Sequence, residues 1–190
     1  NIQIQWAALK AKDYKIPESL EELETMIKDY IAENPKTDDG LDKIGISLST
    51  SDWHWLITLG NPAGFIADGA PDNGQWIVTP ENKGVYKFRS DKEREYFRWL
   101  CRMYNEGILD PEFATQTHED YIAKIASGRV VTLFDKDWDY QDGEKVLKAD
   151  GKYELTYAGL PTCMDADTKC PALMYHGLTT GTGVGISKTC

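Results

Sequence analysis

Two short segments of the sequence pair tryptophan with aspartate, a combination that suits sugar binding. The apolar C–H face of a sugar ring stacks on an indole, while carboxylates accept hydrogen bonds from the ring hydroxyls. The six residues that we expect to contact such a ligand are Asp52, Trp53, Trp55, Asp137, Trp138 and Tyr140. The alternative is that these tryptophans only fill the edge of a hydrophobic core.

Both segments directly follow a predicted strand. Residues 44–49 alternate apolar and small side chains, and residues 130–134 form a β-branched, aromatic run, so both read as strands. In open α/β sheets, ligands bind beyond the carboxyl ends of the strands. We therefore expect the two segments to lie on one surface.

Other chemistries find less support in the sequence. The three histidines, His54, His118 and His176, are scattered without partners at metal-binding spacing, so we expect no catalytic or metal-binding role for them. The hydrolase motifs HExxH and GxSxG are absent. Residues 181–189 lack the glycine before the lysine and the following helix that a phosphate loop needs. No catalytic residue, cofactor or metal is predicted.

Two features leave a choice open. Carboxylates cluster around Gly40 in the loop 34–42 and could bind calcium, although their spacing departs from the EF-hand pattern and favours a solvated turn. Cys163 and Cys170 bracket a short polar loop, and they could form a disulfide or remain thiols.

Charge and composition narrow the range of partners. Acidic residues number 31 and basic residues 21, giving a net charge of −10, and no basic cluster is visible. Nucleic acid and anionic membrane surfaces are therefore poor partners. No apolar run reaches the length of a membrane span. The chain begins with neither methionine nor a signal peptide, so we expect it to be part of something larger.

Helical and strand patterns alternate along the chain, which indicates an α/β fold. Capped, amphipathic patterns predict helices at 20–33, 91–106, 118–127 and 142–149, with a further short helix at 52–59. Strands are predicted at 44–49, 130–134, 153–158 and 184–187, and a hairpin at 75–79 and 85–88. In the helix 91–106, Phe97, Leu100 and Tyr104 are expected to form the buried stripe.

Several ordered motifs resemble those of bacterial extracellular solute-binding proteins. Residues 104–112, YNEGILDPE, resemble the LY-x-EGLIDPE stretch of that family. Residues 121–130 resemble its following helix, which ends in SGR or SGK before a strand. Residues 16–23 and 34–40 are similar to a helix start and the loop after it. The resemblance is to family 1-like, lipoprotein-type carbohydrate binders of ABC importers.

This resemblance implies a specific organisation. Such proteins have two lobes of a periplasmic-binding-protein-like, type II fold, with a ligand cleft between them. Residues 1–190 would be a single lobe, with helices packed on a small mixed sheet and the other lobe absent from this chain. Residues 181–190 would cross back through the hinge, so the two ends should lie near each other.

The resemblance also implies a function. The protein would capture a sugar or oligosaccharide and present it to ABC permease subunits, without catalysing a reaction. It would lie outside the cell, as a Gram-positive surface lipoprotein or in the periplasm, and touch the membrane only through a lipid anchor outside this chain. Two alternatives stay open: a fragment of a glycoside hydrolase, or a stand-alone carbohydrate-binding module. The sequence does not identify the solute.

Overall fold

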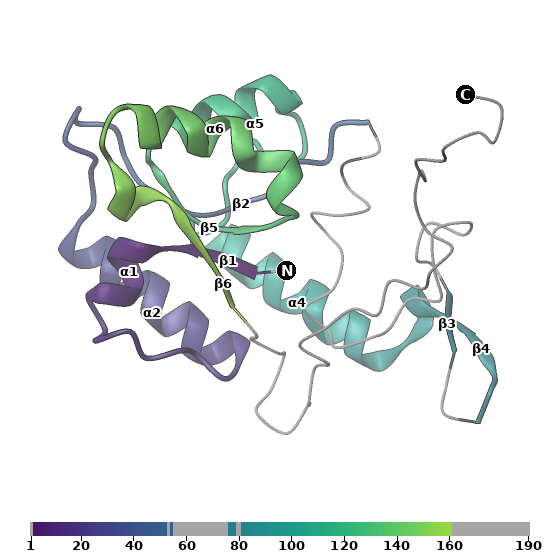
Figure 1. The fold of residues 1–190 in the computed structure, drawn as a ribbon. Helices are drawn as coiled ribbons and strands as arrows, with labels where there is room; N and C mark the ends of the chain where they lie inside the picture. Colours follow the sequence, from purple (N-terminus) through teal and green to yellow (C-terminus); the bar gives the residue numbers. More distant parts are fainter. Residues whose placement is uncertain (1, 53, 55–75, 79–80, 161–190) are drawn as a thin grey trace, which may run out of the picture.

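A four-stranded mixed sheet forms the centre of the computed structural model, which describes residues 2–52, 54, 76–78 and 81–160 (Figure 1). The strands are β1 (Ile2–Gln5), β2 (Ile44–Ser47), β5 (Val130–Phe134) and β6 (Tyr157–Leu160). Their order is β2-β5-β1-β6. β2 and β5 run parallel, whereas β1 is antiparallel to both β5 and β6. The α/β class and the small mixed sheet are therefore confirmed.

Helices cover both faces of this sheet (Figure 1). They are α1 (Trp6–Lys10), α2 (Leu20–Glu33), α4 (Asp91–Asn105), α5 (His118–Ala126) and α6 (Asp137–Ala149). One hydrophobic cluster joins α1, α2 and α4 to one face and includes Leu23, Ile27 and Met103. A second cluster joins α5 and α6 to the other face through Tyr121 and Ile125. The result is a sheet between two helical layers.

Side-chain caps set several helix boundaries as predicted. The Ser19 and Ser90 hydroxyls accept hydrogen bonds from the backbone N–H groups of Glu22 and Glu93, which fixes the starts of α2 and α4. Thr117 and Asp120 form a reciprocal capping box at the start of α5. The predicted hairpin is also confirmed, as β3 (Trp76–Val78) and β4 (Gly84–Tyr86).

Three sequence expectations are wrong in their details. Helix α6 begins at Asp137 and not at residue 142, and the strand predicted at 153–158 is a short 3-10 turn followed by β6. The buried stripe of α4 consists of Tyr96, Trp99, Leu100 and Met103. Phe97 is half-buried and Tyr104 is 46% exposed. Trp99, which belongs to this stripe, donates a hydrogen bond from its indole N–H to Glu24 of α2.

Some expectations fall outside the described residues. These are most of the helix at 52–59, the strand at 184–187, the pair Cys163 and Cys170, and the two chain ends. Within the described residues, none of the helices has the length and apolar character required to cross a bilayer.

The buried carboxylate of Asp110 connects strand β2, the YNEGILDPE stretch at residues 104–112, and helix α5. Asp110 is 1% exposed and accepts hydrogen bonds from the Ser47 hydroxyl at 2.8 Å and from the Lys124 ammonium at 2.8 and 3.1 Å. It also accepts the backbone N–H of Glu112. Since Asp110 lies in the YNEGILDPE stretch, that stretch performs a structural task here. It anchors helix α5 to the end of strand β2.

We predict that Asp110→Asn lowers the free energy of unfolding by about 3 kcal/mol, because it leaves a largely buried ammonium facing a neutral amide. Lys124 is only 11% exposed, and its other carboxylate partner, Glu112, lies at the surface. Urea denaturation measures the change. Asp142→Asn, at an exposed position on α6, is the matched control and should change stability by less than about 0.5 kcal/mol. Equal stability of the two variants would contradict the anchoring role.

A second ionic contact joins α2 to α4. The carboxylate of Glu24 accepts hydrogen bonds from Lys28, Trp99 and Arg102. Burial raises the pKa of Glu24, but the three donors together lower it by more, so the net pKa lies below its ordinary value. The folded chain therefore favours the charged form of Glu24.

This shift predicts a pH dependence of stability. Because the folded pKa of Glu24 lies below its unfolded pKa, its contribution is complete above about pH 4.5 and declines as the pH falls through the folded pKa. Glu24→Gln should therefore destabilise the protein at pH 7 and lose this effect progressively at pH values below about 4.5, as measured by urea denaturation. Glu95→Gln, on the exposed side of α4, is the control. A destabilisation by Glu24→Gln that stays constant between these pH values would refute the assignment.

Candidate functional site

The carboxyl ends of the parallel strands β2 and β5 meet at one edge of the sheet. The chain leaves β2 through Ser49 and Ser51 toward His54, and it leaves β5 through Asp135 into helix α6. Helix α5 begins at the same edge with His118. Figure 1 shows β2 and β5 running beneath α5 and α6. Three elements thus deliver polar side chains to one place.

Two histidines and a carboxylate converge at this edge. The imidazole rings of His54 and His118 stack with centroids 4.1 Å apart and planes 13° from parallel. The Nε2 atoms of His54 and His118 lie 3.4 and 3.8 Å from the Oδ1 atom of Asp139. The expectation that the histidines are scattered and without partners is therefore wrong for these two. His176 lies outside the described residues.

A backbone carbonyl orients His54. Its Nδ1 atom lies 2.9 Å from the Ser51 carbonyl oxygen, which can only accept a hydrogen bond. In the neutral imidazole the proton therefore resides on Nδ1, and the lone pair of Nε2 faces Asp139. The tight turn that holds this arrangement includes Asp52 in the left-handed region, at φ 51°. Aspartate tolerates that conformation better than most residues.

A second carboxyl group lies beneath this cluster. Asp135 is fully buried, and it accepts hydrogen bonds from the Tyr121 hydroxyl at 2.9 Å and from the backbone N–H of Lys136 at 2.6 Å. Burial, and then the neighbouring charge of Asp139, raise the pKa of Asp135 to about 7. Asp135 therefore retains a proton at a pH where an exposed aspartate has lost it.

The structure brings the two predicted ligand segments together. Contact between His54 and Asp139 places the loop after β2 against the first turn of α6. Asp52, Asp137 and Trp138 are exposed, the last of them by 53%. Trp53 and Trp55 lie outside the described residues.

Tyr140 departs from the prediction. It is only 4% exposed, and its ring packs edge-on against Tyr157 at 5.5 Å. The reason is that residues 137–149 form a helix, whose inward positions are 139, 140, 143 and 147. Tyr140 is therefore part of the core and not of the exposed surface.

The residues that the sequence analysis missed are His54, His118 and Asp139. They lie on three elements that are distant in sequence, so spacing could not connect them. One signal was present: His54 belongs to the segment Ser51-Asp52-Trp53-His54-Trp55, which follows a strand of the same edge. If α6 had been predicted to begin at Asp137, helical periodicity would have placed Asp139 on the inward face, toward His54.

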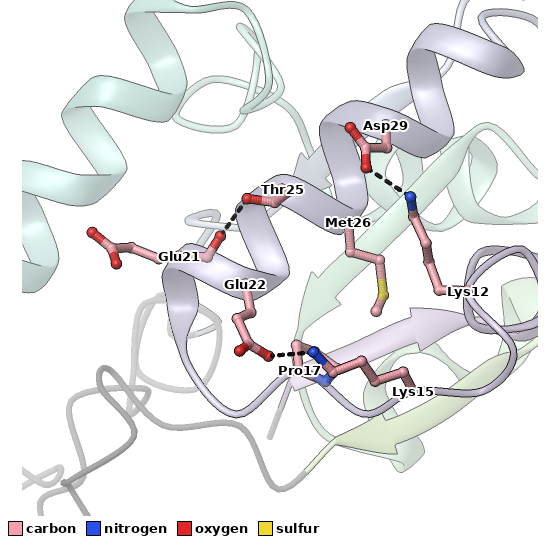
Figure 2. A pocket seen from close by; sticks show the side chains of 8 residues that line it. All are labelled: Lys12, Lys15, Pro17, Glu21, Glu22, Thr25, Met26 and Asp29. Carbon is pink, nitrogen blue, oxygen red and sulfur yellow. Dashed lines mark hydrogen bonds and ion pairs between the residues drawn. The ribbon is translucent and has the colours of Figure 1, made fainter.

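A separate hollow of about 420 Å³ lies beside α2, and Figure 2 shows the side chains around it. Both of its lysines are paired with carboxylates: the Lys12 ammonium lies 2.7 Å from Asp29, and that of Lys15 lies 3.7 Å from Glu22. No residue of the His54, His118 and Asp139 cluster lines it. Paired charges of this kind offer little to a ligand, so we place the functional site at the β2 and β5 edge.

The acidic loop 34–42 forms a turn closed by its own contacts. The backbone N–H of Thr37 donates to the Leu41 carbonyl at 2.8 Å, and the Lys36 ammonium pairs with Asp42 at 2.6 Å. A further lysine, Lys152, lies 3.5 Å from Asp39. Two of the loop carboxylates thus already face lysines, which favours the solvated turn over a calcium loop.

Comparison with known proteins finds similarity in structure but not in sequence. No family model matches the chain, and no curated protein sequence matches it. Among solved structures, the chain is similar to an "HMO binding ABC-transporter associated Solute Binding Protein" from Bifidobacterium longum infantis, at 17% identity and a TM-score of 0.59, covering 70% of this chain and 29% of that chain.

Two further solved structures are similar. The S. pneumoniae ABC-transporter substrate-binding protein FusA, in complex with kestose, has 19% identity and a TM-score of 0.57, covering 73% of this chain and 28% of that one. The alginate-binding protein AlgQ2 without calcium ion has 16% identity and a TM-score of 0.50, covering 69% and 26%. This chain therefore spans less than a third of each of these three proteins. The likeness shows that this chain shares the fold of the matched part of each of these proteins.

Proposed function

We propose that residues 1–190 form one lobe of a two-lobe solute-binding protein, which captures an extracellular sugar or oligosaccharide for an ABC importer. The observation that carries this proposal is the contact between His54 and Asp139, which unites the two tryptophan and aspartate segments at one edge of the sheet. The fold supports it, because the similar structures are solute-binding proteins described as binding HMO, in complex with kestose, or as alginate-binding.

The exposed residues of this edge provide the chemistry that a sugar requires. The indole of Trp138 presents an apolar face for the C–H side of a sugar ring. The carboxylates of Asp52 and Asp137 are free of core packing and can accept hydrogen bonds from hydroxyl groups. Trp53 and Trp55, in the same segment as His54, would extend the stacking surface.

A binding role fits the carboxyl groups better than hydrolysis does. A glycoside hydrolase needs two carboxyl groups that reach the sugar from a cleft, about 5 to 10 Å apart. Among the described residues, Asp135 is the carboxyl group with a raised pKa, and its complete burial keeps it away from any sugar. The similar proteins are binding proteins, which also supports a role without catalysis.

The remaining parts of the proposal follow from this role. A partner lobe would close over the ligand, and the loaded protein would dock on ABC permease subunits. The protein would act outside the cell, either as a surface lipoprotein of a Gram-positive bacterium or in the periplasm. Its membrane contact would be a lipid anchor outside residues 1–190.

We predict that the 190-residue protein binds kestose or alginate oligosaccharides with roughly millimolar affinity in calorimetric titrations, since one lobe supplies about half of the contacts. Trp138→Ala should weaken this binding about tenfold, which corresponds to the loss of one stacking contact of about 1.4 kcal/mol. The matched control is Trp6→Ala. Trp6 is also exposed, but it directly follows β1. Because β1 is antiparallel to β5, the carboxyl end of β1 lies at the opposite end of the sheet from the carboxyl end of β5.

The alternatives give different results. If the isolated chain binds as tightly as the two-lobe protein, it is a stand-alone carbohydrate-binding module. Release of the chromophore from chromogenic glycosides would instead indicate a hydrolase. Equal effects of the Trp138 and Trp6 substitutions would contradict the proposed binding edge.

A further inference from the structure

Three potential metal ligands meet at the β2 and β5 edge. One atom from each of His54, His118 and Asp139 can be chosen so that all three lie within 4.8 Å of one another. The two imidazole Nε2 atoms face the same carboxylate oxygen, at 3.4 and 3.8 Å. His54 lies in the loop after β2, His118 is the first residue of α5, and Asp139 lies in the first turn of α6.

The hydrogen bonding of His54 prepares it to bind a cation. Its Nδ1–H donates to the Ser51 carbonyl, so the lone pair of Nε2 points at a carboxylate oxygen. A cation between the two would accept electron pairs from both the imidazole nitrogen and the carboxylate oxygen. Histidines that bind metals commonly donate their second N–H to a backbone carbonyl, as His54 does.

The distances suit a tetrahedral ion. With bonds of about 2.0 to 2.1 Å, two ligands of a tetrahedral zinc ion lie about 3.3 Å apart. The separations of 3.4 and 3.8 Å differ from this value by about 0.5 Å or less, and rotation of one of the two stacked imidazoles would direct both nitrogens at one ion. Imidazole nitrogens favour zinc, nickel, cobalt or copper over calcium or magnesium, which prefer oxygen ligands.

We propose that His54, His118 and Asp139 bind a divalent transition metal ion of the zinc class. Three protein ligands leave a fourth position for water or for an oxygen of a bound molecule. This site goes beyond the proposed sugar binding and does not depend on it, since the ligand atoms converge without any sugar.

The supporting structure around the ligands is rigid. The capping box of Thr117 and Asp120 fixes the start of α5 next to His118. Helix α6 lies close against α5 at Gly143, where an added Cβ would come within 2.7 Å of Ile125. The side chain of Asp139 is only 4% exposed, so its carboxylate has little freedom to turn away. Ligands held on packed helices keep their geometry better than ligands on loops alone.

The test is a calorimetric titration of the whole 190-residue chain with zinc, after chelator treatment and in the presence of a phosphine reductant. The variants are His118→Gln and Asp139→Asn, and the control is Asp142→Asn, an exposed carboxylate one turn further along α6. Circular dichroism verifies that each variant is folded. We expect each ligand substitution to weaken zinc binding by about 100-fold or more, since loss of a supporting partner alone costs about 10- to 100-fold. The control should bind as the unaltered protein does.

Cobalt provides a second readout that separates this site from cysteine binding. A cobalt ion held by nitrogen and oxygen ligands should show visible d–d absorption without a thiolate charge-transfer band, and this absorption should disappear in His118→Gln. Zinc affinities that are equal in all four proteins would overturn the proposal. A cobalt spectrum with thiolate bands that is unchanged in the variants would also overturn it, because the metal would then bind at cysteines. Neither metal experiment includes a sugar. A negative result for metal binding is therefore distinct from a negative result in the sugar titration.

Discussion

The buried pair between Asp110 and Lys124 sets the geometry on which the functional edge depends. Asp110 also accepts the hydroxyl of Ser47, the last residue of β2, so one carboxylate fixes the end of that strand relative to helix α5. Because His118 begins α5 and His54 follows β2, this anchor determines how closely the two imidazoles approach. A buried carboxylate needs hydrogen-bond and charge partners, and those of Asp110 lie on β2 and α5, two of the elements that build the site.

The third element, α6, is positioned by packing and not by charge. Gly143 lets α6 approach Ile125 of α5, and the strand β5 delivers the chain to the start of α6 beside the same edge. Helical periodicity then divides the tryptophan and aspartate segment. Trp138 faces solvent, while Asp139 and Tyr140 face inward. The exposed indole of Trp138 and the inward carboxylate of Asp139 therefore come from consecutive residues of one helical turn.

The sequence predicts the local features of this fold well and the non-local ones poorly. Helix α2 has the predicted bounds because its cap, Ser19, and its apolar face are signals within one short segment. Strand β1 was not predicted, although its Ile and Gln residues alternate as in a strand. It lies between β5 and β6 in the sheet, and all four of its residues are buried. The meeting of His54 with His118 depends on the pairing of β2 with β5, which no local pattern encodes. Tyr140 was misplaced for a related reason, because its segment was treated as a loop when it is the start of a helix.

The central claim is that ligands bind at the carboxyl edge of β2 and β5. Chemical-shift mapping on isotope-labelled protein, titrated with an oligosaccharide, tests this claim most directly because it reports every backbone amide. The account predicts that the largest changes occur at Asp52, His54 and the first turn of α6, with small changes along α2. Changes concentrated around the hollow of Lys12 and Asp29, with none at the β2 and β5 edge, would contradict it.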